Sequence, residues 1–436
     1  MACDLIVGRN ESDKLAFGKR GLAYLGKSYV KMGQYTSLSN PIFLDVARTH
    51  VILVAGKRGS GKSYSLATIA EGISDLNGEE AGNIASLIFD TMGIYWTMKF
   101  KNEKDKALLD EWGLKSKNVP VKVFAPLGHF KDMREKGISI DKEFAIKISA
   151  LDAGDWLGVF NLGFTDPVGV AIERAISKLK EEKKSYSFED IFNKFNQIEE
   201  INQESKNSAV AFFEAAKSWG VFDEKNGTEI KDLIKAGQTT IIDLSMYASI
   251  GSFNVRALVI GLVSKKLFNE RMASRKVEEV QSIQQGVNWD KHQVQREMPL
   301  VWIFIDEAHE FLVHESLGKT PASDALIQIL REGRQPGLSL ILATQQPGKI
   351  HTDAITQSDI VISHKVTSEL DVKALNAITQ SYLYSNITDK INSLPKLKGS
   401  AIILDDNSER IYPMRVRPRF TWHGGEAPMA IKKEEN

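Results

Sequence analysis

Short apolar runs rich in β-branched residues recur along the chain and alternate with longer amphipathic stretches. Most of these runs are continuous rather than alternating, which is typical of strands buried on both faces of a mostly parallel sheet. The predicted strands are Val51–Ala55, Ala85–Phe89, Val119–Phe124, Thr239–Leu244, Leu300–Ile305, Leu338–Ala343, Ile360–Ser363 and Ala401–Leu404.

Helical spacing of apolar residues falls between several of these strands, at Ser63–Ile73, Arg256–Ala273 and Ser323–Arg334. Strands that alternate with helices predict an α/β domain in which helices cover both faces of a twisted sheet. Two segments break this rhythm. Residues 126–237 have helical spacing and almost no strand-like run, so they predict a helical insertion. The polar, Gln-rich stretch Arg275–Glu297 predicts an exposed excursion before the next strand.

These patterns divide the chain into four parts. A sheet core is expected from residues 46–125 and 238–415, with the insertion 126–237 between them. Residues 1–45 predict a short N-terminal β segment, and residues 416–436 a C-terminal tail. The last ten residues, Ala427–Asn436, end in mixed charges and are expected to be frayed.

Composition narrows the class of protein without identifying it. The 56 basic residues equal the 56 acidic ones, so an overall positive coat for nucleic acid is excluded, although a local basic channel is not. The single cysteine, Cys3, excludes an internal disulfide framework and a Cys-based zinc site. No apolar run approaches the ~18 residues of a membrane-spanning helix, and the N-terminus lacks a secretory pattern. We therefore expect a cytoplasmic protein with no membrane partner.

The strongest chemical signal is Gly56-Lys57-Arg58-Gly59-Ser60-Gly61-Lys62-Ser63, which matches the pattern G-x-x-x-x-G-K-[ST] between a predicted strand and a predicted helix. Glycines let successive backbone N–H groups point into one concavity, and the following helix adds its positive end. We expect Lys62 to reach the β- and γ-phosphates and the Ser63 hydroxyl to bind Mg²⁺. The predicted ATP-binding residues are Gly56, Lys57, Arg58, Gly59, Ser60, Gly61, Lys62, Ser63 and Tyr64.

Two acids, Asp306 and Glu307, follow the apolar run Val301–Ile305. In the sheet of a phosphate-loop ATPase, the first acid orients Mg²⁺, and the second is placed to polarise water for attack on the γ-phosphate. Taken alone, such a pair is also compatible with an ordinary acidic cap at a turn. No Asn-Lys-x-Asp motif for reading a guanine base is present. The sequence therefore favours ATP and hydrolysis.

A polar residue at the end of the strand beside Asp306 can reach the γ-phosphate, and Thr344 or Gln345 would lie there. Arg331 and Arg334 end a predicted helix, where the helix dipole favours cations in any case. The functional alternative is an arginine that reaches the ATP of a neighbouring subunit. His309 is expected to be a structural residue rather than a catalyst.

The ordered set of motifs resembles the HerA-like branch of the HerA/FtsK superfamily of hexameric, ATP-driven DNA translocases. The resemblance rests on His50–Val54 running into the phosphate loop, on Phe304–Phe311, on Leu330–Arg334 and on Ala343–Pro347, with a weaker match at Leu87–Asp90. It implies a RecA/ASCE-type P-loop NTPase fold and a homo-hexamer with ATP and Mg²⁺ between subunits and double-stranded DNA in the central pore.

The resemblance also implies roles for single residues. Lys62 and Ser63 would bind phosphate and Mg²⁺, Asp306 would bind Mg²⁺, Glu307 would act on water, and Gln345 would sense the γ-phosphate. Arg334 would act in trans on the neighbouring ATP, with Arg331 as a second candidate.

This sequence departs from the family pattern in three places. Only about 45 residues precede the ATPase core, so at most a reduced form of the usual N-terminal β-barrel is expected. The family's Asp-Pro-His-Gly-Glu-Tyr segment is Asp90–Tyr95 here and lacks the acid. The usual Thr-Gln-Arg-Pro is Thr344–Pro347, with Gln346 in place of the arginine.

Two functions remain open from the sequence. The first is a hexameric motor that translocates on double-stranded DNA, for which Lys99, Lys101 and Lys104 are candidate DNA contacts; a solvated charged face is the plain alternative for these lysines. The second is a nucleotide-gated scaffold that regulates an effector, such as a nuclease or a sirtuin-like NAD hydrolase in antiviral defence. The arginine and sensor set favours the motor, whereas neutral charge and the short N-terminal segment favour the scaffold.

Overall fold

The computed structural model describes residues 4–32, 35–249, 254–285, 296–366, 368–379 and 387–426. Its described strands are β1 (Leu5–Val7), β2 (Leu22–Met32), β3 (Tyr35–Asp45), β4 (Val51–Ala55), β5 (Ile84–Asp90), β6 (Val121–Pro126), β7 (Lys142–Phe144), β8 (Ile146–Lys147), β9 (Phe222–Asp223), β10 (Thr239–Asp243), β11 (Leu300–Ile305), β12 (Leu338–Thr344), β13 (Ile360–Ser363), β14 (Ser400–Asp405) and β15 (Arg410–Val416).

The α-helices are α1 (Glu11–Phe17), α2 (Lys62–Ser74), α3 (Gly78–Ala81), α4 (Lys106–Glu111), α5 (Phe130–Glu135), α6 (Ala153–Phe160), α7 (Pro167–Glu182), α8 (Phe188–Gln197), α9 (Gln203–Ser218), α10 (Ile230–Leu233), α11 (Val255–Gln285), α12 (Ser323–Glu332), α13 (Thr352–Thr356), α14 (Glu369–Thr379) and α15 (Ile387–Asn392). None of the described helices is both long and apolar enough to cross a bilayer.

Thirteen of the described strands form one sheet, in the order β1-β3-β2-β15-β14-β13-β4-β12-β11-β5-β10-β6-β7. From β13 to β7 every neighbouring pair is parallel. All eight predicted strands are present, each within a few residues of its expected bounds. The mostly parallel α/β fold is therefore confirmed.

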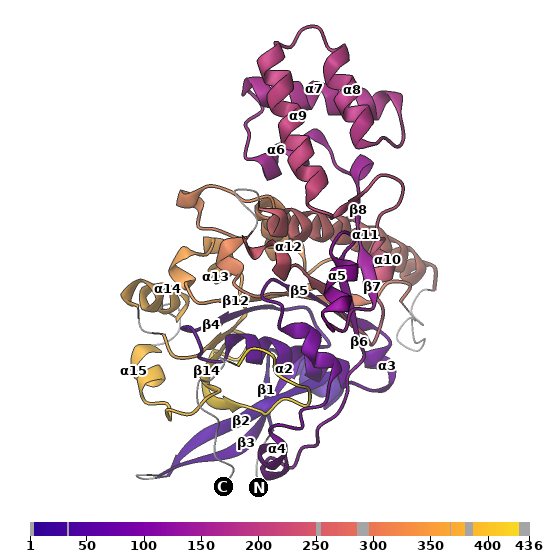
Figure 1. The fold of residues 1–436 in the computed structure, drawn as a ribbon. Coiled ribbons are helices and arrows are strands. Elements are labelled where there is room, and N and C mark those ends of the chain that lie inside the picture. Colours follow the sequence, from indigo (N-terminus) through magenta and orange to yellow (C-terminus); the bar gives the residue numbers. More distant parts are fainter. Residues whose placement is uncertain are drawn as a thin grey trace.

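Helices cover both faces of this sheet (Figure 1). On one face, Ile52 and Ile341 pack in the same apolar cluster as Leu66 and Ile69 of α2. On the other face, residues such as Leu342 pack with α11 and α12. Because successive residues of a strand point to opposite faces, a strand between two helical layers must be apolar at every position. This explains why the central runs are continuous.

Residues between β6 and β10 form the expected helical insertion. Helices α6 to α9 lie together away from the sheet, at the top of Figure 1. Their core is aromatic, with the ring of Trp156 4.7 Å from that of Phe213. Short strands were not expected here, but β7 pairs with β6 at the sheet edge, and β8 pairs with β9.

Three boundaries differ from those expected. The N-terminal strands β1 to β3 continue the main sheet through β15, so among the described residues they form a sheet extension rather than a separate reduced barrel. Residues 275–285 continue helix α11 instead of beginning an irregular excursion, and Glu278 in this part of the helix pairs with Arg296, just before β11. Residues 417–421 are buried against the core, whereas the expected frayed end, Ala427–Asn436, lies outside the described residues.

Candidate active site

The phosphate-loop motif lies between β4 and α2, in the strand–loop–helix context that its chemistry requires. Gly59 and Gly61 have φ angles of +74° and +111°, which side chains rarely adopt. A Cβ on Gly56 would lie 2.4 Å from Ser60 Oγ. Ser60 Oγ is buried and has no hydrogen-bond partner among the described residues. The loop is thus closely wound and holds a polar atom that an incoming phosphate can satisfy.

Lys62 is folded against this loop. Its side chain is buried, and Nζ donates a long hydrogen bond of 3.5 Å to the carbonyl oxygen of Lys57. Ser63 and Tyr64 are half-buried on the first turn of α2, while Lys57 and Arg58 are exposed at the tip of the loop. The backbone and Lys62 therefore surround the concavity, and the exposed pair is placed at its rim.

His364 packs against the phosphate loop. Its Nε2 lies 2.9 Å from Ser65 Oγ, and its Nδ1 lies 3.1 Å from the carbonyl oxygen of Ser400. Complete burial, which no nearby anion compensates, lowers the pKa of His364 to about 4. A neutral imidazole avoids placing a second positive charge beside Lys62.

Asp306 lies at the carboxyl end of β11 and is almost completely buried. Its Oδ1 accepts the backbone N–H of Glu307 at 2.9 Å, and its Oδ2 accepts the hydroxyl of Tyr95 at 2.9 Å. The Tyr95 hydroxyl also lies 3.5 Å from the carbonyl oxygen of Ser63. Tyr95 therefore joins the two predicted Mg²⁺ ligands.

Tyr95 was assigned no role from the sequence. Burial, together with the Asp306 charge, raises its pKa well above the ordinary value, so the phenol remains a donor. Its segment is held by Asp90, whose Oδ1 accepts the N–H groups of Met92, Gly93 and Ile94 and whose Oδ2 accepts that of Tyr95. The match at Asp90–Tyr95 was a signal, but only the fold brings the phenol to Asp306.

Glu307 has a left-handed backbone, with φ of +49°. Such a conformation in a residue other than glycine is strained and is found most often at functional sites. Its Oε2 is buried without a hydrogen-bond partner among the described residues. Burial, and then the charge of Asp306, raises the pKa of Glu307 to about 7, against the opposing effect of Lys62. This carboxylate is thus poised to accept a proton near neutral pH.

Strand β12 lies between β4 and β11, so its carboxyl end faces both the loop and the acids. Thr344 is buried there, and the half-buried Gln345 follows it. Thr344 Oγ1 lies 3.1 Å from Nδ1 of His309, which is itself 3.6 Å from Oε2 of Glu307. The structure thus brings Gln345 to the edge where a γ-phosphate would lie, and His309 packs beside Glu307.

The donor set fits Mg²⁺. This ion is usually held by one or two carboxylates, the phosphates of a nucleotide and water, rather than by a cage of protein ligands. Asp306 and the Ser63 hydroxyl provide such a set. The Tyr95 hydroxyl contacts both the backbone carbonyl oxygen of Ser63 and the side-chain carboxylate of Asp306. The described part of the chain contains no group of three or more His, Cys, Asp or Glu side chains arranged around a metal.

Arg331 and Arg334 lie far from this site, at the amino edge of the sheet. Strand β12 separates them from Gln345 by seven residues, which is about 20 Å of extended chain. Arg331 Nε donates to Asp353 Oδ2 at 2.7 Å. Arg334 is exposed and forms no ion pair or hydrogen bond with the described residues. Neither arginine can reach the phosphate loop of its own chain.

The three candidate DNA-binding lysines follow β5 near the C-terminal segment. Lys99 Nζ pairs with Asp141 Oδ2 at 2.8 Å, and Lys104 pairs with Glu426. Lys101 is exposed, and its backbone bridges to Thr421. Two of the three charges are therefore partly neutralised within the chain.

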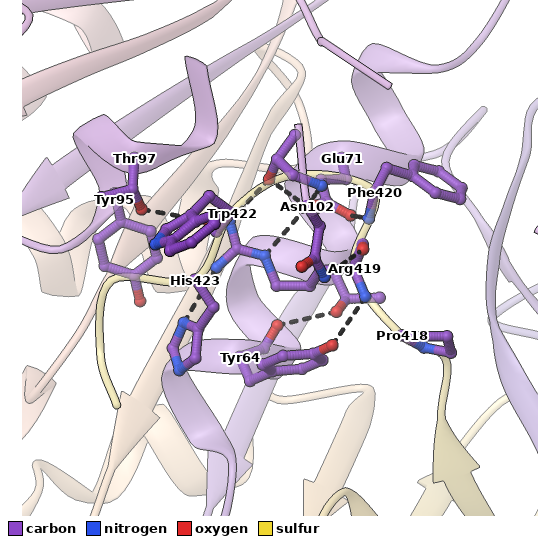
Figure 2. Close-up of polar contacts among 12 residues, drawn as sticks. Tyr64, Glu71, Tyr95, Thr97, Asn102, Pro418, Arg419, Phe420, Trp422 and His423 are labelled. Carbon is purple, nitrogen blue, oxygen red and sulfur yellow. Dashed lines mark hydrogen bonds and ion pairs between the residues drawn. The ribbon is translucent and has the colours of Figure 1, made fainter. Parts of the chain in front are cut away.

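Residues 417–423, here called the C-terminal strap, cross helix α2, which begins at the end of the phosphate loop (Figure 2). Tyr64 Oη accepts the backbone N–H of Arg419 at 2.7 Å. Glu71 of α2 is completely buried and pairs with both Arg417 and Arg419 at 3.0 Å. Sequence reasoning placed these residues in a tail, because nothing local indicates that an acid 350 residues away will pair with them.

Comparison with known proteins agrees with this geometry. Residues 30–266, just over half of the chain, match the family described as "Helicase HerA, central domain". The curated "Probable helicase MJ1565" of Methanocaldococcus jannaschii is 25% identical over 241 residues, which cover 53% of this chain and 43% of that protein. The match thus spans less than half of that relative's length.

Among solved structures, VirB4 of Thermoanaerobacter pseudethanolicus aligns with a TM-score of 0.51, covering 92% of this chain and 97% of that chain at 11% identity. The bacterial conjugative coupling protein TrwB covers 86% of each chain with a TM-score of 0.47 and 13% identity. At such low identity the VirB4 likeness concerns the fold. The family match, which spans more than half of the chain, shows that the chain belongs to the HerA helicase central-domain family of P-loop NTPases.

Proposed function

We propose that this protein is an ATP-hydrolysing motor that translocates on double-stranded DNA as a homo-hexamer. The observation that carries the proposal is the position of Glu307: a strained, buried carboxylate with one free oxygen, next to Asp306 and on the same edge of the sheet as the phosphate loop. A protein that only holds nucleotide has no need of a second acid at this point. Hydrolysis requires a group that accepts a proton from water.

The roles of the residues follow from their positions. The loop N–H groups and Lys62 would bind the phosphates, and Ser63 and Asp306 would hold Mg²⁺, which neutralises charge on the phosphate oxygens. Tyr95 would keep the two ligands together by donating to Asp306. Glu307 would accept the proton of the attacking water, and Gln345 would orient the γ-phosphate.

Assembly into a ring is proposed from the position of Arg334. The loop lies at the carboxyl edge of the sheet and Arg334 at the amino edge, so a head-to-tail contact between copies can bring one edge to the other. An exposed, unpaired guanidinium is suited to stabilise charge on a departing phosphate. Lys101, with Lys99 and Lys104, is proposed to face DNA.

The test is the ATPase rate of the purified protein with and without long double-stranded DNA, at low and at moderate salt. A motor that grips the phosphate backbone should be stimulated by DNA, and the stimulation should fade as salt rises, because counterion release drives such binding. A slow rate that DNA does not change would contradict the motor. It would favour the nucleotide-gated scaffold for an effector such as a nuclease or NAD hydrolase.

Action in trans is tested by mixing. Arg334→Ala protein should bind ATP nearly as well as the natural chain but hydrolyse it slowly, and when mixed in it should inhibit natural subunits more than dilution predicts. The Arg331→Ala protein is tested in the same way, as the second candidate for the trans role. Arg331 already pairs with Asp353 of its own chain. Activity that falls only in proportion to the fraction of Arg334→Ala chains would overturn the trans role.

A further inference from the structure

Five arginines line one cleft at the amino edge of the sheet, opposite the phosphate loop. The cleft has a volume of about 230 Å³. It lies between the turn before β4, helix α11 and the starts of β11 and β12. Its lining arginines are Arg48, Arg271, Arg275, Arg296 and Arg334, and the other lining residues carry no acid.

Three carboxylates behind the cleft compensate only part of this charge. Arg48 pairs with Asp13 at 2.8 Å. Glu278 is shared by Arg271 at 3.1 Å, Arg296 at 2.8 Å and Arg275 at 3.5 Å. Arg275 also pairs with Glu279 at 2.5 Å. Five guanidinium charges therefore meet three carboxylates, which leaves two positive charges facing the cleft.

One of these arginines is buried and has one nitrogen without a hydrogen-bond partner among the described residues. Arg271 is completely buried; its Nε donates to the carbonyl oxygen of Pro336 at 2.7 Å, and its Nη1 donates to that of Met298 at 2.8 Å. Its Nη2 has no hydrogen-bond partner among the described residues. A buried, unsatisfied charged donor is costly, so its retention points to a ligand that completes it.

The backbone of Gly337 lies beside this donor. Gly337, in the wall of the cleft, has a φ of +86°. A Cβ at this position would lie 2.4 Å from Leu300 Cδ2 and 3.4 Å from Arg271 Nη2. A side chain at this position would therefore collide with Leu300 and lie against the unpartnered Arg271 donor, which is why the wall of the cleft carries a glycine here.

We propose that this cleft is a second phosphate-binding site, which takes a phosphate or pyrophosphate group between Arg271, Arg296 and Arg334. Planar guanidinium forks match phosphate oxygens and bind them in pairs. A multiply charged phosphate can balance two positive charges, whereas a carboxylate brings only one. The volume admits a phosphate group but falls below that of the pockets that enclose a drug-sized ligand. The phosphate can come from a nucleotide held by a second copy of this chain or from a free anion.

The test separates this cleft from the phosphate loop. Pyrophosphate is titrated calorimetrically, with EDTA present, into the Lys62→Ala protein, in which the loop is disabled. One binding site should remain. In the Arg296→Gln/Arg334→Gln double variant on the same background, affinity should fall at least tenfold. These two arginines are partly exposed, so the variant is expected to fold, which its circular dichroism and Tm verify.

Arg174→Gln is the matched control, because it removes one guanidinium from α7 in the insertion, away from the cleft. It should leave the affinity unchanged. Loss of all binding in Lys62→Ala, or binding that the double variant retains, would overturn the proposal. The titration needs neither hydrolysis nor DNA, so its result is independent of the proposed motor.

Light scattering distinguishes the two sources of phosphate. If the cleft receives the nucleotide of a second copy, pyrophosphate should block ATP-dependent association of the natural chain, and the double variant should not associate. If the ligand is a free anion, pyrophosphate should bind while association with ATP is unchanged. Either result supports the phosphate-binding site, and it shows whether the phosphate belongs to the nucleotide of a second copy or to a free anion.

Discussion

Two arginine clusters of this protein, each built around a buried glutamate, differ in whether every guanidinium nitrogen of their buried arginines has a hydrogen-bond partner. In the first, Glu71 pairs with Arg417 and Arg419 beneath the C-terminal strap, as Figure 2 shows in part. Each guanidinium nitrogen of these two arginines has a partner: Glu71, a backbone oxygen, Thr421 or His423. In the second, Glu278 is shared by three arginines, and Arg271 Nη2 is left without a partner in the described part of the chain.

The same contrast separates the buried acids. Both oxygens of Glu71 accept hydrogen bonds, and the neighbouring arginines keep its pKa below the ordinary value although burial opposes them. Glu307 has a free oxygen and a raised pKa. Saturated charges fix structure, and incomplete ones mark places where a ligand or a reaction supplies the missing partner. Four experiments probe this distinction.

The largest effect is expected for Glu307→Gln. The amide keeps the shape of the side chain but cannot accept a proton, so ATP turnover should fall by about a hundred- to ten-thousandfold. ATP binding should persist, because Lys62 and Ser63 are unchanged, and equilibrium binding of labelled ATP checks this. Turnover close to the natural rate would show that another residue activates water.

For Glu71→Ala we expect the largest loss of stability, about 3–5 kcal/mol, because two buried guanidinium groups lose their counterion. Urea unfolding measures the loss. Phosphate should not restore stability, since the strap leaves no open approach. A small loss, or rescue by phosphate, would break the distinction between the two clusters.

Glu278→Gln should cost less, about 1–3 kcal/mol, since Arg275 and Arg296 are partly exposed and keep water as a partner. Here added pyrophosphate should recover part of the loss, because an anion can take the place of the carboxylate. Thermal unfolding with and without pyrophosphate measures both quantities. Equal responses of the Glu71 and Glu278 variants to pyrophosphate would contradict the open-cluster interpretation.

The smallest effect is the pH dependence of turnover at low ATP. Glu307 acts when deprotonated, and its pKa is about 7, so kcat/KM should be about tenfold lower at pH 6 than at pH 8. The effect of pH on stability has the opposite sign: the free energy of unfolding should fall as pH rises. The folded pKa exceeds the ordinary 4.5, so the protonated acid stabilises the fold at low pH, and this contribution is lost as pH rises towards 7. The difference in the free energy of unfolding between the natural and Glu307→Gln proteins should therefore change over this pH range. A difference that stays constant would contradict the raised pKa of Glu307.

Local sequence patterns were enough to predict the central sheet, the phosphate loop and the paired acids of the site. Continuous apolar runs predicted strands within a few residues, because a strand between two helical layers has no polar face. The phosphate loop and the acids after β11 were predictable because each is a contiguous segment whose chemistry depends on its own backbone. The full order of strands was not: the strand before Gln345 was expected beside that of Asp306, but only the structure shows that it also lies beside β4 and the phosphate loop.

Two of the three misplaced boundaries share one cause. Residues 275–285 were expected to begin a polar, exposed excursion, and residues 417–426 were expected to belong to a C-terminal tail. Each is instead held by ion pairs with residues distant in sequence, as Arg417 is with Glu71 or Arg296 with Glu278. Ion pairs between residues 18 or 346 positions apart leave no periodic signal in the chain.

The sequence by itself determined the phosphate loop, the paired acids and the alternation of strands and helices, because these depend on neighbouring residues and on backbone geometry. Only the tertiary structure decided that Tyr95 reaches Asp306, that Glu307 keeps a free oxygen, and that five arginines from four segments converge on one cleft. These properties depend on which groups meet in space and on how fully each buried charge is satisfied, and folding alone sets both.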